Sequence, residues 1–329
     1  MIQDPGRMVI ANPLAAFERQ GMLKLLAPAK VNLFLGVGAL RGDGYHEVTT
    51  VMHALSLHDV LHIDYFPESD GGLCVELECH AREGLEDLEI DTEDNLAVRA
   101  IRLLAQKLGR DQGQGHNETF RIRIEKHIPF EAGLGGGSSN AAAALVGAAH
   151  FWGVEPAAPE VIAAASELGS DVCFFLYGGC VCLTGTGEKY SHRLDPMKGS
   201  VVLVKPDKGV STREAYRVFD KEPPPIPADV AQSATTVQRA QEVPLFNNLA
   251  PAAESLCLEL ASVRAWLEDQ PGVESVLLCG SGAASFAVCE NFDAACKIVA
   301  AAQLQGWWAR ATSFSSLKAS FVDPSLRSG

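Results

Sequence analysis

"IPFEAGLGGGSSNAAAAL", residues 128–145, crowds four glycines and two serines into seven positions ahead of a run of alanines. The alternating pattern over 119–129 predicts a half-buried strand before it, and a helix is expected over 138–152. Glycines let the backbone approach a ligand closely, and the first N–H groups of a helix are unpaired and partly positive. We therefore predict a phosphate cradle, in which Ser138 and Ser139 cap the helix or offer hydroxyls to a phosphate or its Mg²⁺.

Two better-known phosphate loops do not fit this stretch. A Walker A loop needs a lysine directly after its last glycine, and none follows here. A dinucleotide fingerprint that begins at Gly133 reaches Ser138 where its third glycine should stand. The alternative without a ligand is a glycine-rich turn that lets an alanine-rich helix pack tightly.

Composition narrows the class of protein. The chain has 329 residues, is 47% hydrophobic and carries a formal net charge of −14. This acidic balance argues against nucleic-acid and anionic-membrane partners, but a local site can still hold a small phosphorylated ligand. The nine cysteines contain no C-x-x-C pair, as expected of free thiols in a reducing compartment, and no apolar run reaches the length of a membrane span. We expect a cytoplasmic protein, either a monomer or a weak homodimer.

The order of predicted elements favours an α+β fold, because strands lie next to each other as well as alternating with helices. We expect an N-terminal extension over 1–22, a first domain over 23–195 and a second over 196–329. A proline-rich insertion is predicted near 221–243.

Two local patterns give further predictions. Strand-like segments lie on both sides of Pro28, and the apolar run over 172–190 predicts a strand broken by glycines.

Three motifs in order carry a family resemblance. The segment P-x-x-x-G-L-G-G-G-S-S-N-A at Pro129–Ala141 closely resembles the phosphate-binding motif of the GHMP kinases. "PAKVNLFLGV" at 28–37 with "GDGYHEV" at 42–48 resembles their N-terminal motif, and "LLCGSGAASFAV" at 277–288 their C-terminal glycine motif. The resemblance implies a two-domain fold with the active site in the interdomain cleft, and a kinase that uses ATP carrying Mg²⁺.

Further segments resemble one branch of this family, notably "RGDGYHEVTTVMHALSLHD" at 41–59 and "GSDVCFFLYGGCVCLTGTGE" at 169–188. The branch implies phosphorylation of the 2-hydroxyl of a CDP-linked sugar alcohol, in non-mevalonate isoprenoid biosynthesis. Two alternatives stay open: another GHMP small-molecule kinase of the homoserine or mevalonate type, and a catalytically silent nucleotide-binding regulator. The aromatic pair 45–46 argues against the first, and retention of both Lys30 and Asp171 argues against the second.

The resemblance assigns catalysis to two residues. Asp171 is expected after a helix and before an apolar strand, where it accepts the proton of the substrate hydroxyl. Lys30 pairs with Asp171 and stabilises charge near the transferred phosphoryl group. The alternatives are a turn aspartate and a lysine that extends to the surface. Asn32 lies one strand period from Lys30 and is expected to hydrogen-bond the substrate.

The acceptor side is assigned to residues from three segments. Tyr45 is expected to stack on cytosine, and His46 to hydrogen-bond the edge of the base. Tyr216 corresponds to the second aromatic of the stack, although its helical pattern also fits a core residue. Thr212 and Ser281 are expected to contact the substrate, with a tight turn as the alternative at Ser281.

The implied ATP site consists of residues Asn95, Leu96, Lys126, Pro129, Gly133, Leu134, Gly135, Gly136, Gly137, Ser138 and Ser139. Alternatives are a helix N-cap for Asn95, a core position for Leu96 and a solvated strand end for Lys126. Glu131 departs from the family pattern and puts an extra carboxylate beside the phosphate loop. The histidines at 46, 53, 58 and 62 do not share one strand face, so no protein-held metal is predicted beyond the Mg²⁺ of ATP.

Overall fold

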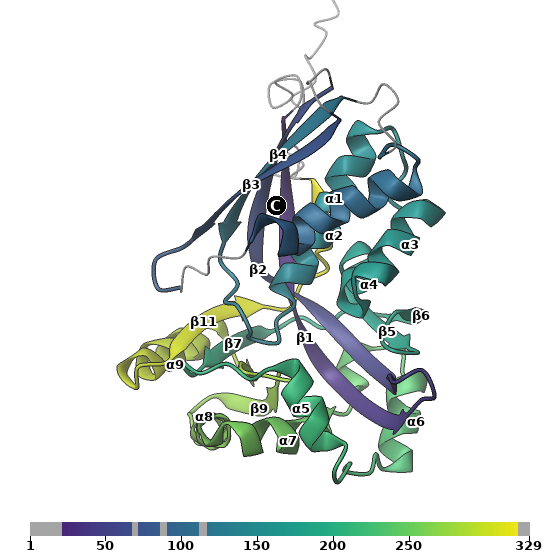
Figure 1. The fold of residues 1–329 in the computed structure, drawn as a ribbon. Coiled ribbons are helices and arrows are strands. Elements are labelled where there is room, and N and C mark those ends of the chain that lie inside the picture. The colour runs from purple at the N-terminus through teal and green to yellow at the C-terminus, as the bar shows by residue number, and fades with distance from the viewer. Residues whose placement is uncertain (1–21, 68–71, 86–90, 112–116, 322–329) are drawn as a thin grey trace, which may run out of the picture.

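A computed structural model describes residues 22–67, 72–85, 91–111 and 117–321. The predicted N-terminal extension therefore lies almost entirely outside the described residues. Two antiparallel strands, β1 (Met22–Leu40) and β2 (His46–Phe66), form a long hairpin through the middle of the molecule (Figure 1). The turn between them contains Gly44 at a positive φ of 85°, a conformation that glycine adopts without cost.

The first sheet is built around this hairpin. Its strand order is β12-β1-β2-β4-β3, with β5 and β6 continuing from β2 and β8 pairing in parallel with β1. The remaining strands of the sheet are β3 (Leu73–Ala81), β4 (Glu118–Lys126), β5 (Cys180–Thr184), β6 (Lys189–Leu194), β8 (Phe246–Asn247) and β12 (Ser320–Phe321). Since β8 and β12 follow residue 196, the C-terminal part of the chain returns to this sheet.

Four helices pack together against one side of the first sheet (Figure 1). They are α1 (Leu96–Lys107), α2 (Gly136–Phe151), α3 (Pro159–Leu168) and α4 (Ser170–Tyr177), with a short 3-10 turn at Thr92–Asp94 before α1. Helix α2 is the central one, and its alanines at 141–144 are fully buried. Their small side chains let the sheet and the other helices approach α2 closely, since protein interiors are close-packed.

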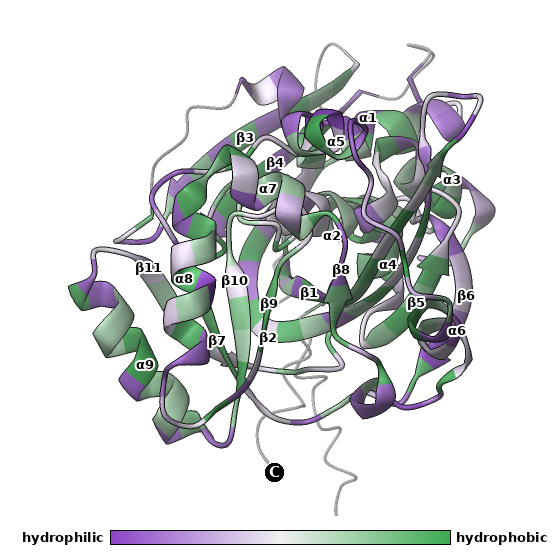
Figure 2. Ribbon diagram, turned by 90° about the horizontal axis from the view of Figure 1, so that it is seen from below, coloured by the Kyte–Doolittle hydropathy of each residue, from purple (hydrophilic) through white to green (hydrophobic). Residues whose placement is uncertain are grey.

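A second, antiparallel sheet has the order β11-β7-β10-β9. Its strands are β7 (Ser200–Lys205), β9 (Val273–Leu278), β10 (Ser285–Cys289) and β11 (Trp308–Ser313). One face packs on α8 (Leu258–Glu268) and α9 (Phe292–Leu304), as Figure 2 shows from below. The other face joins a core that contains apolar residues of β1, among them Leu33.

The remaining helices lie beside the hairpin and the second sheet. They are α5 (Thr212–Phe219), α6 (Ala228–Thr236) and α7 (Ala250–Leu256), with a 3-10 turn at Ala240–Glu242. Helix α6 and that turn lie within the predicted proline-rich insertion. No helix of the described chain is long and apolar enough to cross a membrane.

The α+β class is confirmed, and two local predictions are wrong. The run expected as a strand forms α4 over Ser170–Tyr177 before β5 begins, so Asp171 lies in the first turn of a helix. A continuous apolar run does not by its periodicity distinguish a buried strand from a buried helix. The two strand segments around Pro28 are one strand, in which the pairing register with β2 shifts between Pro28 and Lys30.

Candidate active site

A cavity of about 880 Å³ lies where the two sheets meet. Strand β1, the glycine loop 131–138, the start of α4, helix α5 and the turn 280–281 all contribute to its walls. All the residues predicted to bind substrate or ATP line it except Asn95 and Ser139. The tertiary structure therefore brings segments from the whole length of the chain to one place.

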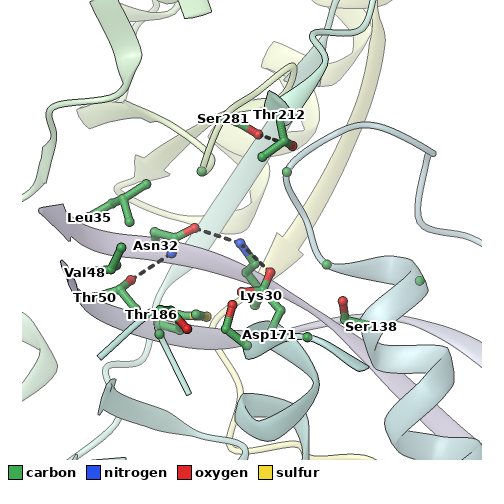
Figure 3. A pocket seen from close by; sticks show the side chains of 18 of the residues that line it. Lys30, Asn32, Leu35, Val48, Thr50, Ser138, Asp171, Thr186, Thr212 and Ser281 are labelled. Atoms are coloured by element: carbon green, nitrogen blue, oxygen red, sulfur yellow. Dashed lines mark hydrogen bonds and ion pairs between the residues drawn. The ribbon is translucent and has the colours of Figure 1, made fainter. Parts of the chain in front are cut away.

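A chain of polar contacts crosses the floor of this cavity (Figure 3). The Nζ of Lys30 lies 3.4 Å from Oδ2 of Asp171 and donates to Oδ1 of Asn32 over 2.8 Å. The Nδ2 of Asn32 donates to Oγ1 of Thr50 over 2.9 Å, and that hydroxyl donates to a main-chain carbonyl of β1. Lys30, Asn32 and Thr50 are buried, whereas the Asp171 side chain is 32% exposed. A fixed ammonium therefore faces a carboxylate that remains open to the cavity.

The glycine loop is held against the second sheet. Main-chain N–H groups of Ala283 and Ala284 donate to the carbonyls of Glu131 and Ala132, each over 3.0 Å. Gly133 has a φ of 73°, and a Cβ there would lie 2.0 Å from the carbonyl oxygen of Cys279. The glycine at this position is therefore required by packing against the β9–β10 turn, in addition to any approach of a ligand.

The loop leads directly into α2. Gly135 is its left-handed N-cap, and a Cβ there would lie 2.8 Å from the Phe175 ring. Within the described structure α2 has no side-chain cap, so its first N–H groups are available to a ligand. Ser138 lines the cavity, whereas Ser139 is fully buried and its Oγ has no hydrogen-bond partner in the described structure.

Lys126 is held in a second polar cluster that the sequence did not reveal. It forms a close ion pair with Asp59, and it donates to Oδ1 of Asn140 over 3.1 Å. Asp59 is fully buried and also accepts from Nδ2 of Asn140 and from the main-chain N–H groups of His127 and Ile128. The cluster ties the end of β4 to the first turns of α2 beneath the glycine loop. Lys126 is thus buried, and the alternative of a solvated strand end is wrong.

The other end of the cavity carries the aromatic residues. Tyr45 is 64% exposed at the tip of the β1–β2 hairpin, and His46 and Tyr216 have ring centroids 5.5 Å apart. Burial, with a smaller contribution from the charge of Asp171, raises the pKa of Tyr216 to about 12, so its phenol stays neutral. The hydroxyls of Thr212 and Ser281 lie 2.8 Å apart, and Thr212 belongs to the same helix, α5, as Tyr216.

Both nitrogens of His46 have partners within the chain. Nδ1 lies 2.9 Å from the carbonyl oxygen of Gly38, and Nε2 lies 2.9 Å from Oδ1 of Asp220. Asp220 and Thr50 line the cavity but were missed by sequence reasoning. Asp220 stands in no motif, and Thr50 lies within the segment 41–59 but was given no role there. Asn95 caps α1 by accepting from the N–H of Ala97 over 3.0 Å, which fits its alternative interpretation.

Comparison with known proteins places the chain in a family. The model for the GHMP kinases N terminal domain matches residues 95–179, and the model for the GHMP kinases C terminal matches residues 232–306. A protein of Desulfitobacterium hafniense named 4-diphosphocytidyl-2-C-methyl-D-erythritol kinase is 37% identical over 85% of this chain and 92% of its own length. The chain belongs to the GHMP kinase family.

Other relatives of this GHMP kinase agree. A protein of Nocardia farcinica with the same name is 39% identical over 85% of this chain and 88% of its own length. A crystal structure of 4-(cytidine 5'-diphospho)-2C-methyl-D-erythritol kinase superimposes with a TM-score of 0.67 at 33% identity, over 89% of this chain and 99% of that chain. Homoserine kinase from Cytophaga hutchinsonii has a TM-score of 0.66 over 93% of this chain and 98% of its own, but at 17% identity it shows the fold alone.

Proposed function

We propose that this kinase transfers the γ-phosphoryl group of ATP to the 2-hydroxyl of 4-diphosphocytidyl-2-C-methyl-D-erythritol, a step of non-mevalonate isoprenoid precursor biosynthesis. The observation that carries the proposal is the position of the Lys30–Asp171 pair. It lies in one cavity with the glycine loop and with the aromatic residues Tyr45 and Tyr216. The glycine loop suits the phosphates of the donor, and the two aromatic residues suit the base of a nucleotide-linked acceptor.

In this proposal Asp171 is the general base. The carboxylate lies in the first turn of α4 with part of its surface open to the cavity, where it can accept the proton of a hydroxyl. Lys30 lies 3.4 Å from this carboxylate and contributes positive charge where charge develops on the transferred group. Asn32, fixed between Lys30 and Thr50, orients the acceptor. Catalysis is then positioning and charge stabilisation, with no covalent intermediate.

The glycine loop and the first turn of α2 hold the phosphates of ATP in the same proposal. The N–H groups left without a side-chain cap and the accessible Ser138 hydroxyl suit an anion. The buried Cys279 beneath the loop is no competing nucleophile, since burial raises the pKa of its thiol to about 12. Across the described residues no group of three or more His, Cys, Asp or Glu side chains is placed to hold a metal ion. Mg²⁺ is proposed to arrive with ATP, and the accessible hydroxyl of Ser138 can serve as one of its ligands.

We further propose the domain division 23–195 and 196–329, with the active site between the two and β8 and β12 returning to the first sheet. The substrates are then small molecules, and no nucleic acid or membrane takes part. The protein is proposed to be cytoplasmic and to act as a monomer or weak homodimer.

The test is ADP release with ATP, Mg²⁺ and the CDP-linked acceptor, run beside methylerythritol phosphate, homoserine and mevalonate. Turnover with the CDP-linked acceptor alone is expected, because the other three acceptors have no base for the aromatic residues to bind. Turnover with one of the others would keep the kinase and discard the acceptor. If no ADP is released with any of the four acceptors while ATP still binds, the result would favour a nucleotide-binding regulator.

A further inference from the structure

Asp220 stands next to the acceptor end of the cavity without a role so far. It is the C-cap residue of α5, and its side chain is 45% exposed. It lines the same cavity as Tyr45, His46 and Tyr216. One carboxylate oxygen, Oδ1, lies 2.9 Å from Nε2 of His46.

The contacts of His46 decide which group can recognise a base there. Its Nδ1 faces a carbonyl oxygen and its Nε2 faces a carboxylate oxygen, and both of these atoms only accept hydrogen bonds. Each ring nitrogen therefore already has a partner within the chain. The ring itself packs against Tyr216 and Phe219 of α5, with ring centroids 5.5 Å and 5.6 Å away.

The second carboxylate oxygen of Asp220 is differently placed. Among the contacts of the described residues, none engages Oδ2. Arg41, the basic residue of the turn between β1 and β2, is paired with Asp43 over 2.8 Å and lies 3.5 Å from Glu47. A carboxylate anchored at one oxygen therefore lines the same cavity as the exposed Tyr45 ring, and its second oxygen is left to accept from a ligand.

We infer that Asp220 is a specificity-determining residue that accepts a hydrogen bond from the exocyclic amino group of the base, and so selects cytosine over uracil. The inference rests on the proposed function for the presence of a pyrimidine nucleotide. Cytosine presents an amino donor at the position where uracil presents a carbonyl oxygen, and carboxylates accept from that amino group. A fixed carboxylate therefore attracts the first base and repels the second.

The test measures the dissociation constants of CDP and UDP by calorimetry for the wild-type protein and for Asp220→Asn. The wild type is expected to prefer CDP by about tenfold or more, as one charge-assisted hydrogen bond allows. In Asp220→Asn the preference should fall close to unity, because the amide can turn its NH₂ group toward the uracil oxygen. Asp220→Glu, which keeps the carboxylate, should retain part of the preference.

Glu214→Gln is the matched control, since Glu214 is an exposed carboxylate of the same helix that pairs with Arg217. It should leave both dissociation constants unchanged. The affinity for ATP and the melting temperature check that each variant is folded. The inference is overturned if the wild type does not distinguish CDP from UDP, or if Asp220→Asn weakens both nucleotides equally.

The kinetic assay separates this inference from the proposed function. If the wild type fails to phosphorylate the CDP-linked acceptor but its preference for CDP depends on Asp220, the proposed reaction is wrong and the inference stands. If it phosphorylates the acceptor and Asp220→Asn keeps the full preference for CDP, the inference alone is wrong.

Discussion

Two buried lysines line the same cavity, and the carboxylates beside them differ in what else they contact. Lys30 lies 3.4 Å from Asp171, whose side chain is 32% exposed. Lys126 is paired with Asp59, which is fully buried and accepts further hydrogen bonds from Asn140 and from two main-chain N–H groups. Only the first carboxylate keeps surface open to the cavity.

The difference teaches how to separate a reactive pair from a structural one. A carboxylate whose two oxygens both accept hydrogen bonds from buried donors is not accessible to a substrate proton. Its role is structural, because it satisfies those donors. A carboxylate held at one side and open at the other can take a proton without disturbing the fold. The comparison is testable because each pair has a residue whose removal should act on a different property.

Asp171→Asn should give the largest effect on turnover. The amide keeps the shape but cannot accept the proton, so kcat is expected to fall about 10³- to 10⁴-fold. Single-turnover kinetics would measure the loss, and calorimetry would show ATP affinity within about twofold of wild type. Near-normal turnover would mean that Asp171 is not the base and that its pair with Lys30 is structural.

Asp59→Asn should give the largest effect on stability. It leaves the buried Lys126 ammonium without a counter-charge and places an amide among donors, which costs about 3–5 kcal/mol in unfolding free energy. Urea unfolding would measure it. Lys126→Met, which leaves the Asp59 charge buried, should be comparably destabilised. If the urea midpoint of both variants equals that of the wild type, the Lys126–Asp59 pair does not stabilise the fold and the distinction between a reactive and a structural pair fails.

Lys30→Met should abolish turnover with a smaller loss of stability than Lys126→Met. Its partner Asp171 remains partly hydrated, but the buried Oδ1 of Asn32 loses its donor, so the unfolding free energy is expected to fall by about 1–3 kcal/mol. The same urea experiment compares it directly with Lys126→Met. A loss as large as that of Lys126→Met would mean that both lysines support the fold equally.

Glu131→Gln should have the smallest effect. Glu131 is exposed at the edge of the glycine loop, and a Cβ at Gly209 would lie 2.7 Å from its Oε2, so the carboxylate turns toward that neighbouring loop. Removing one exposed charge near the phosphates should lower KM for ATP about twofold, and less at high salt. Glu125→Gln is the control, because it removes a carboxylate that pairs with His62. A rise in KM would assign Glu131 a part in holding ATP.

Much of the site was predictable because several of its elements depend on residues that are close together in the sequence. The glycine loop followed by an alanine helix forms as expected, with α2 beginning at Gly136. The alternating strand β4 and the Asn95 cap of α1 follow from periodicity and from capping chemistry over a few residues. Helix α4 could not be predicted in this way, because an apolar run of eight residues fits a buried helix as well as a strand.

The sequence by itself determined the glycine loop ahead of a helix, the α+β class and the family, since each depends on residue types at short, fixed spacings. Only the tertiary structure decided which charged groups meet. Asp59 meets Lys126 and Asn140, and His46 meets Asp220, across long stretches of chain. Such contacts depend on how β2, β4, α2 and α5 are packed, and the pattern of a single segment carries no information about the partner that another segment brings to it.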